Sequence, residues 1–274
     1  MNPPHISFIG AGNMARSLIG GLIADGWPAE RIRAADPDPD QRATLTQHAG
    51  IATDAENVAA VQAADVVVLA VKPQVMRPVA QEIAAAVQTH RPLVISIAAG
   101  IRVADLDRWL GGDNAIVRGM PNTPALVQSG ATALFANPRV STEQRNRAES
   151  ILRAVGLTLW LDREELMDAV TALSGSGPAY LFLVMEALQA AGERLGLPAE
   201  AARLLTLQTA FGAAKMALES AEDAAVLRQR VTSPGGTTEC ALQVLEDGGL
   251  RELMARALAS ARDRSRELAD QLGK

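Results

Sequence analysis

The stretch "HISFIGAGNMARSLIGGLIADG", residues 5–26, decides the fold of this chain. His5 to Ile9 is a short apolar run, and the segment Gly10-Ala-Gly12-Asn-Met-Ala15 follows it directly. Apolar side chains then recur at helical spacing, at Leu18, Ile19, Leu22 and Ile23. The stretch therefore predicts a strand, a tight turn and a helix in immediate succession.

The spacing of small residues in this turn is typical of a dinucleotide site. Gly10 permits the turn, Gly12 lets the backbone approach a pyrophosphate, and Ala15 lets the helix pack closely on the strand. The start of the helix offers free N–H groups to phosphates. The next strand, "RIRAAD" (31–36), ends in Asp36, a partner for a ribose hydroxyl at about the usual separation of 20 residues. A glycine turn without a ligand is the alternative for an isolated motif, but here the flanking strand and helix favour dinucleotide binding.

Apolar strands and helices continue to alternate after this unit. Strands are predicted at 64–71, 92–100, 114–120, 131–137 and 157–161, and helices around 54–63, 75–88, 103–110 and 141–154. Continuous apolar strands separated by helices predict a parallel, doubly wound α/β sheet. Ligands of such sheets bind beyond the carboxyl ends of the strands.

Three segments at these strand ends are candidate site residues. Lys72-Pro73 and Ala99-Gly100 follow two of the strands, and "MPNTPA" (120–125) follows a third. Lys72 either contacts phosphate or ribose, or is a solvated loop lysine. Asn122 and Thr123 lie in a turn stiffened by prolines, which either lines the site or is only a turn.

From about Glu164 onward the chain reads as almost wholly helical. Pro178, after "SGSG" (174–177), predicts a kink or a new helix start. Residues 180–185, "YLFLVM", leave no polar face, so the helix that holds them must be buried all round. The helical part offers little interior for this purpose, and a subunit interface is the expected place of burial.

The loop "SPGGTT", residues 233–238, precedes an amphipathic run and contains no charged side chain. A helix that begins near Gly235–Thr238 leaves its first N–H groups unpaired. These groups and the helix dipole form a site for a small anion such as a carboxylate. Ordinary capping of the helix by Ser233 is the alternative.

Composition excludes several function classes. The net charge of −5 gives no electrostatic footprint for nucleic acid, and no apolar run reaches the roughly 18 residues of a membrane span. The first ten residues do not form a secretory signal, and one cysteine fits a reducing cytoplasm. Three isolated histidines provide neither metal-ligand spacing nor a Ser–His–Asp set. We therefore expect a cytoplasmic protein whose chemistry comes from a cofactor.

Six segments, in this order, resemble those of the pyrroline-5-carboxylate reductase family. They are "FIGAGNMA", "AVKPQ", "MPNTPA", "DAVTALSGSGPAY", "QTAFGAAKM" and "VTSPGGTTECALQVLE", which extend from residue 8 to about 247. The resemblance implies a Rossmann-like dinucleotide domain over residues 1–162 and an all-α dimerisation and substrate domain over 163–274. It also implies hydride transfer from NADPH or NADH to the C=N bond of 1-pyrroline-5-carboxylate. The product is L-proline, and the reaction is the last step of proline biosynthesis.

The resemblance assigns roles to individual residues. The pyrophosphate is expected at Gly10, Ala11, Gly12, Asn13 and Met14. The rest of the cofactor site is expected at Asn57, Ala70, Val71, Lys72 and Pro73, with Ala98, Ala99, Gly100, Met120, Pro121, Asn122 and Thr123 near the nicotinamide. The backbone at Ser233, Gly235, Gly236 and Thr237 is expected to hold the substrate carboxylate. Thr238 is the catalytic candidate, with its hydroxyl on the ring nitrogen, and Glu164 is expected to reach the substrate site from the partner domain.

The preferred cofactor and the size of the assembly stay open. Many NADPH-using relatives carry Ser or Asn, often followed by Arg or Lys, where this chain has Asp36. A carboxylate there repels a 2′-phosphate and favours NADH, and the nearest cations are Arg33 and Arg42. The resemblance implies a homodimer, with a decamer of dimers as an open extension. No nucleic acid, membrane or metal is expected as a partner.

Two other readings of the sequence remain. A β-hydroxyacid dehydrogenase also joins a dinucleotide domain to helices, and Lys215 would then have to be its acid–base group, although its setting, "GAAKM", is reductase-like. A nucleotide-binding scaffold without catalysis is the other reading. The intact glycines and the intact SPGGTT loop argue against a scaffold.

Overall fold

A computed structural model describes residues 3–62 and 64–274 of the chain. Its contacts divide it into two compact units, of which the first runs up to Ser176 and also includes Ala261–Lys274. The second unit is Gly177–Ser260. The domain boundary between residues 162 and 163 stays a prediction from the sequence. Within the described residues, no helix combines the length and the apolar character needed to cross a membrane.

The first unit is built on one sheet, which has eight strands within the described residues. The strands are β1 (Ile6–Ile9), β2 (Ile32–Ala35), β3 (Ala52–Asp54), β4 (Val66–Leu69), β5 (Leu93–Ser96), β6 (Ile116–Met120), β7 (Gly130–Ala136) and β8 (Gly156–Trp160). Their order is β3-β2-β1-β4-β5-β6-β7-β8, and only the β6–β7 pair is antiparallel among these strands. The predicted doubly wound α/β sheet is confirmed.

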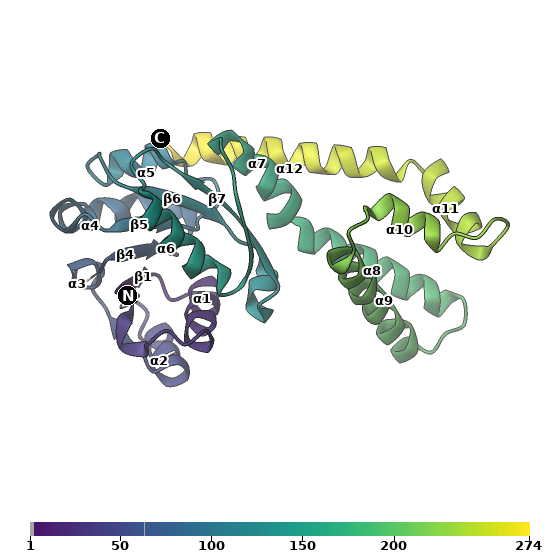
Figure 1. The fold of residues 1–274 in the computed structure, drawn as a ribbon, viewed down its shortest axis with the longest axis horizontal. Helices are drawn as coiled ribbons and strands as arrows, with labels where there is room; N and C mark the ends of the chain where they lie inside the picture. Colours follow the sequence, from purple (N-terminus) through teal and green to yellow (C-terminus); the bar gives the residue numbers. More distant parts are fainter. Residues whose placement is uncertain (1–2, 63) are drawn as a thin grey trace. The chain divides into compact units, whose positions relative to one another are not determined.

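Helices cover both faces of this sheet (Figure 1). One face carries α1 (Asn13–Ala24), α2 (Pro39–Ala49) and α6 (Thr142–Arg153). The other face carries α3 (Asn57–Gln62), α4 (Met76–His90), α5 (Val103–Trp109) and the C-terminal turns of α12 (Leu250–Leu272). Short helical turns are η1 (Ala29–Arg31), η2 (Pro73–Val75), η3 (Thr123–Val127), η4 (Glu164–Leu166), α7 (Met167–Val170) and the π-helical η5 (Thr171–Gly175).

Local sequence explains where these elements lie. All four residues of β1, β4 and β5 are buried, as their mainly apolar sequences predict for strands covered on both faces. Helix α6 begins at a capping box, in which the Ser141 hydroxyl accepts from the Gln144 N–H and the Gln144 side chain accepts from the Ser141 N–H. Asp38 caps α2, whose first residue is Pro39.

Two details of the sheet differ from the sequence-based expectation. Strand β3 was not predicted, because its three residues, Ala-Thr-Asp, carry neither an apolar run nor a clear alternation. The sheet is also not parallel throughout, because the connection 121–129 between β6 and β7 is too short for a crossover helix. The antiparallel pair leaves β6 and β7 in one sheet and changes only the direction of the last two strands.

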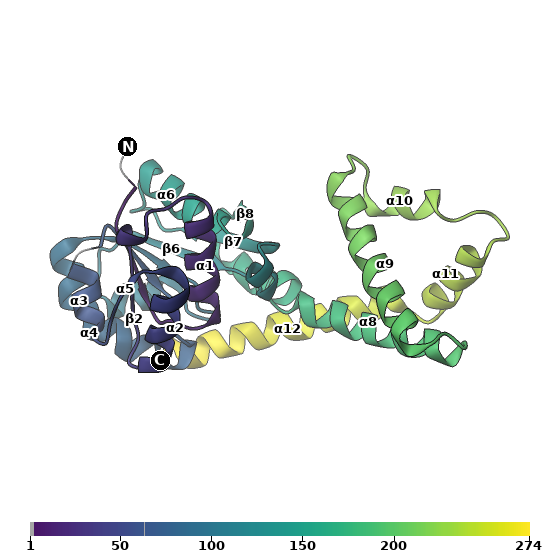
Figure 2. The same ribbon diagram turned by 90° about the horizontal axis from the view of Figure 1, so that it is seen from below.

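The second unit is helical, and Figure 2 shows its helices from a second direction. They are α8 (Gly177–Arg194), α9 (Ala199–Glu219), α10 (Ala224–Arg230), α11 (Thr237–Asp247) and the first part of α12. The predicted helix start at Pro178 is confirmed, because α8 begins at Gly177 directly after the π-helical turn η5.

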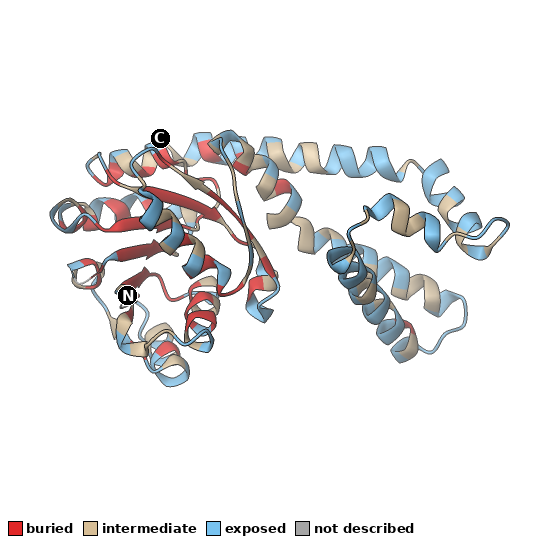
Figure 3. Ribbon diagram, in the orientation of Figure 1, coloured by how far each residue is buried: buried red, intermediate tan, exposed pale blue. Residues whose placement is uncertain are grey.

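This unit has almost no core of its own, as the near absence of buried residues in Figure 3 shows. Among residues 177–260, which are all described, only Ala202 is buried. Leu181, Phe182 and Leu183 on α8 are 60%, 64% and 65% exposed in the single chain, and Phe211 on α9 is 61% exposed. Burying each of these side chains would contribute about 1.5–3 kcal/mol. The apolar surface of α8 and α9 therefore needs cover from a second chain.

We expect the protein to be at least a dimer for this reason. Light scattering at micromolar concentration measures the mass directly, and a dimer has twice the 28.8 kDa of one chain. Replacing Phe182 by Asp places a charge on the exposed face and should shift the population toward monomer. A stable wild-type monomer of 28.8 kDa would contradict the expectation.

Candidate functional site

Two cavities of the first unit have volumes of about 420 and 620 Å³. The larger one lies at the carboxyl ends of β1, β2 and β4. We call the larger one, of 620 Å³, the sheet-edge cavity. Seven residues predicted to bind the cofactor line it: Gly10, Gly12, Asp36, Asn57, Ala70, Val71 and Lys72. The structure thus brings together the glycine turn, the end of β2 and the end of β4 around one cavity.

The glycine turn has the geometry that the motif predicts. Gly10 has φ of +100°, and a Cβ there would lie 2.9 Å from the backbone of Ala70, so only glycine fits between β1 and β4. A Cβ on Gly12 would meet nothing within 4 Å, so this position is open toward the cavity. No described residue accepts a hydrogen bond from the N–H of Asn13 or Met14, and no acidic residue lies in the first turn of α1. These free donors fit a pyrophosphate.

Asp36 is held in place by the backbone around it. One carboxylate oxygen accepts from the Ala11 N–H at 2.8 Å, and the other accepts from the Asp38 N–H at 2.9 Å. Arg42 donates to the main-chain oxygens of Asp36 and Pro37, at 2.7 and 3.0 Å, rather than to a carboxylate. Arg33 pairs with Asp54 at 3.5 Å. Both cations named from the sequence are therefore engaged, and the Asp36 carboxylate lines the cavity with its charge.

Seven further residues of the cavity wall were not predicted. They are Pro37, Asp38, Gln41, Ala55, Val75, Val79 and Glu82. The Glu82 carboxylate accepts from the Asn57 amide at 3.0 Å, which joins α3 to α4. The wall carries more negative than positive charge, because it contains three carboxylates, Asp36, Asp38 and Glu82, and one lysine, Lys72. Asp38 lies two residues beyond Asp36 in the segment "DPDPD" (36–40), and this run of aspartates was the available sequence signal for an acidic cavity wall.

The remaining predicted cofactor residues lie outside the wall of this cavity. Ala11 is buried, Asn13 and Met14 open α1, and Pro73 opens η2. Ala98, Ala99 and Gly100 follow β5, and Met120, Pro121, Asn122 and Thr123 follow β6. The Asn122 amide donates to the Ser174 carbonyl at 3.1 Å and accepts from the Ala131 N–H at 2.9 Å. These bonds give Asn122 a role in the turn itself, and its contact with a cofactor stays a prediction.

The SPGGTT loop belongs to the second unit and precedes α11. Gly236 is the N-cap of this helix, and no side chain caps it, so Ser233 does not play the capping role that the sequence left open. The Ser233 carbonyl instead accepts from the Gly236 N–H at 3.0 Å. Within the described chain, the N–H groups of Thr237 and Thr238 have no acceptor. The hydroxyl of half-buried Thr238 lies on the same first turn.

One contact in this loop was missed by the sequence reasoning. The Glu239 carboxylate accepts from the Gly235 N–H at 2.7 Å. Glu239 is the third residue of α11, which is the position from which a glutamate commonly reaches back to the start of its helix. The N–H of Gly235 is thus already bound to a carboxylate, whereas the donors of Thr237 and Thr238 are free for a ligand.

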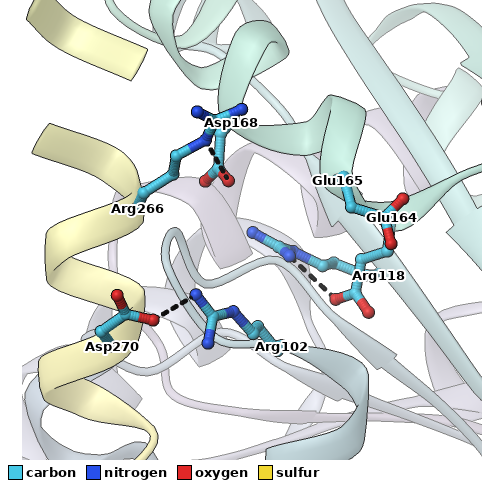
Figure 4. Close-up of a pocket in the computed structure, with 7 residues that line it drawn as sticks. All are labelled: Arg102, Arg118, Glu164, Glu165, Asp168, Arg266 and Asp270. Carbon is cyan, nitrogen blue, oxygen red and sulfur yellow. Dashed lines mark hydrogen bonds and ion pairs between the residues drawn. The ribbon is translucent and has the colours of Figure 1, made fainter. Parts of the chain in front are cut away.

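Glu164 lies in the first unit, where its carboxylate is engaged (Figure 4). Its Oε1 accepts from Arg118 Nη1 and from the Val103 N–H, both at 2.8 Å. The Arg118 side chain is only 5% exposed, and that of Glu164 is 20% exposed. This pair lies in the smaller cavity, of 420 Å³, which is lined by Arg102, Arg118, Glu164, Glu165, Asp168, Arg266 and Asp270. The contact of Glu164 with a substrate stays a prediction.

Family models match both parts of the chain. The family described as pyrroline-5-carboxylate reductase dimerisation matches residues 164–268. The family described as NADP oxidoreductase, coenzyme F420-dependent, matches residues 5–100. The matches fall on the helical part and on the glycine-turn part of the sheet, respectively.

Named relatives are similar over the full length. A pyrroline-5-carboxylate reductase of Pseudomonas aeruginosa is 55% identical over 273 residues, which covers 100% of each chain. A solved structure of this enzyme from Coxiella burnetii has a TM-score of 0.94 at 50% identity and covers 97% of this chain and 99% of its own. The Plasmodium falciparum reductase, solved with NADP bound, has a TM-score of 0.86 at 29% identity and covers 98% of this chain and 99% of its own.

The position of Asp36 predicts its effect on cofactor choice. Asp36→Ser removes the charge at the position expected for the ribose and keeps an oxygen acceptor, so use of NADPH should improve relative to NADH. A charge repulsion of this kind is worth about 1–3 kcal/mol, or roughly ten- to a hundredfold in the ratio of the two kcat/KM values. Asp40→Ser, on the exposed start of α2 and outside the cavity wall, is the matched control. An unchanged ratio in Asp36→Ser would remove this residue from cofactor discrimination.

Glu164→Gln separates a structural role of this residue from a role in binding. The variant keeps a carbonyl acceptor for the Val103 N–H but leaves the buried Arg118 without its counter-ion, so unfolding should become easier by about 3 kcal/mol. Thermal unfolding followed by circular dichroism measures this loss. Glu165→Gln, in the same cavity, should change stability by less than about 0.5 kcal/mol. Lost activity at an unchanged Tm would instead assign Glu164 to ligand binding.

Proposed function

The chain belongs to the pyrroline-5-carboxylate reductase family, and we propose that its sheet-edge cavity and its SPGGTT loop serve the cofactor and the substrate of that reaction. The enzyme reduces the C=N bond of 1-pyrroline-5-carboxylate to give L-proline, the last step of proline biosynthesis. When bound, NADPH or NADH supplies the hydride. The full-length similarity to named reductases is the observation that carries the function.

The residues of the first unit fit a dinucleotide in one orientation. The free N–H groups at the start of α1 suit the pyrophosphate, and Asp36 at the end of β2 suits the adenosine ribose. In the order β2-β1-β4-β5, the opposite side of β1 is left for the nicotinamide half. The ends of β4 and β5 carry Ala70 to Pro73 and Ala98 to Gly100, which are the residues that the resemblance assigned to the cofactor.

The SPGGTT loop fits a small carboxylate without any charged side chain. The N–H groups of Thr237 and Thr238 are free, and the dipole of α11 adds partial positive charge at this end. A carboxylate held there leaves the imine of the same small ring within reach of a neighbouring hydroxyl. We assign that hydroxyl to Thr238, which donates to the ring nitrogen. The basic nitrogen of the cyclic amine that forms takes up a proton readily from water, so no histidine is needed.

The β-hydroxyacid dehydrogenase reading gains no support from its lysine. The Lys215 side chain is 58% exposed and lies 3.7 Å from Glu219, one helical turn along α9. This arrangement is an ordinary surface ion pair. Oxidation of NAD(P)H with pyrroline-5-carboxylate, compared with reduction of NAD(P)⁺ by β-hydroxy acids, tests the proposed function. Turnover only with β-hydroxy acids would overturn it, and absence of turnover with either would favour a binding protein.

The enzyme is a homo-oligomer, as its dimerisation family and its exposed apolar helices indicate. A homodimer is the proposed basic unit, because it is the smallest assembly in which a second chain can cover α8 and α9. Further assembly of such dimers into a decamer of dimers is compatible with this unit and is decided by the measured mass. The proposed location is the cytoplasm, where the exposed thiol of Cys240 stays reduced.

Thr238→Val tests the proposed catalytic hydroxyl. The substitution keeps the shape of the side chain and deletes the hydrogen bond that the hydroxyl donates to the ring nitrogen. That bond strengthens as hydride reaches the adjacent carbon and negative charge builds on the nitrogen, so kcat should fall. A hydrogen bond to a charged or charging group is worth about 1.5–3 kcal/mol, or roughly ten- to a hundredfold. Steady-state kinetics give kcat, and fluorescence titration should show unchanged binding of NAD(P)H.

Thr237→Ala is the control for this variant. Its contribution to substrate binding is assigned to the backbone N–H, which the substitution keeps, so its effect should be much smaller. A Thr238→Val variant with wild-type turnover would show that the hydroxyl has no catalytic role and belongs only to the start of the helix.

A further inference from the structure

The last turns of α12 pack against the loop that follows β5. Ala269 is 1% exposed, and Leu272 packs against the core on the α3–α4–α5 face of the sheet. Gly100, with φ of +72°, presents its backbone to this helix: a Cβ there would lie 3.4 Å from Leu272 Cδ1 and 3.7 Å from the Ala269 nitrogen. All these residues belong to the first unit. The loop is thus covered by residues more than half the chain away in sequence.

Polar contacts tie the same two segments together. Arg102, at the end of the loop, pairs with Asp270 at 2.5 Å (Figure 4). Arg108, on the helix that follows the loop, donates to the Gly273 carbonyl at 2.7 Å. The hydrogen bond that Arg102 donates to the Asp270 carboxylate raises the pKa of Arg102, in agreement with a preferred ion pair. We call residues 269–273 the C-terminal clamp.

The loop held by this clamp lies on the nicotinamide side of the cofactor site. Strand β5 is the second strand from β1 on the side away from β2, which carries Asp36. In a doubly wound sheet the two halves of a dinucleotide lie on either side of the point where the strand order reverses. With the adenosine half at Asp36, the nicotinamide half falls to the ends of β4 and β5.

We propose that the C-terminal clamp holds the Ala98–Arg102 loop ready for the nicotinamide half of the cofactor, with Arg102 and Asp270 as positioning residues. The inference rests on the proposed function, because it takes the cofactor to be NAD(P)H. A loop that is ordered before binding does not have to be ordered by the ligand, and binding is tighter for that reason. Loosening the clamp should therefore weaken cofactor binding and leave the SPGGTT loop untouched.

The test compares single variants of the ion pair with its restoration. Arg102→Gln and Asp270→Asn should each raise the Kd of NADH by about two- to fivefold, as expected for an exposed pair. The doubly exchanged variant, Arg102→Asp with Asp270→Arg, should recover most of the affinity. Arg139→Gln, which breaks the exposed Arg139–Asp113 pair elsewhere in the first unit, should leave the Kd unchanged.

Two further measurements separate positioning from general stability. The KM of the cofactor should rise while the KM of pyrroline-5-carboxylate stays at its wild-type value, and the Tm of Arg102→Gln should match that of Arg139→Gln within about 2 °C. A shortened chain without residues 270–274 should show a larger rise in Kd, of about tenfold or more.

The outcomes are distinct. A wild-type Kd in both single variants overturns the clamp, as does a rise in Kd that Arg139→Gln reproduces or one that merely follows a lower Tm. Wild-type turnover of NAD(P)H with pyrroline-5-carboxylate is measured in the same series. Its absence overturns the proposed function, whereas turnover with an unchanged Kd in the variants overturns the clamp alone.

Discussion

Removal of apolar surface from water is the constraint on which the helical half of this protein depends. Residues 177–260 bury Ala202 alone, while leucines and phenylalanines of α8 and α9 stay exposed in the single chain. A unit this poor in buried side chains cannot offset the conformational entropy that its helices lose on ordering. Association with a second chain therefore stabilises the helices of this unit. Because the SPGGTT loop is the start of α11, its conformation depends on the same association.

The two ligand sites share one chemical strategy, although they lie in different units. Each proposed site has free N–H groups at the start of a helix that follows glycines, α1 after Gly12 and α11 after Gly236. Neither helix start is capped by a side chain, which leaves donors for an anionic ligand. Asp36 adds a carboxylate, held by two backbone N–H groups, to the wall of the sheet-edge cavity. At both helix starts the donors that are free for an anion are therefore main-chain N–H groups rather than charged side chains.

Sequence predicted those features that depend on neighbouring residues. The glycine turn, Asp36 and the helix starts at Pro178 and Thr237 follow from local patterns, and all were found in place. The Arg118–Glu164 pair, the Asn122 bonds and the contact of Gly100 with Leu272 join segments far apart in the chain, and no local pattern indicates them. The antiparallel β7 and the Glu239 contact had local signals, a short connection and a glutamate at the third helical position, which were not used.

The position of Cys240 has a practical consequence. It is the single cysteine of the chain, it is exposed, and its N–H makes the first regular bond of α11, to the Gly236 carbonyl. A thiol-reactive fluorophore attached there would sit two residues beyond Thr238 without labelling any other site and without prior mutagenesis. Its fluorescence emission would report whether the SPGGTT loop holds a ligand. The rate at which the fluorophore reacts with Cys240 would report how far a second chain covers this part of the helical unit. The chain therefore carries a natural attachment point for time-resolved spectroscopy beside its proposed substrate site.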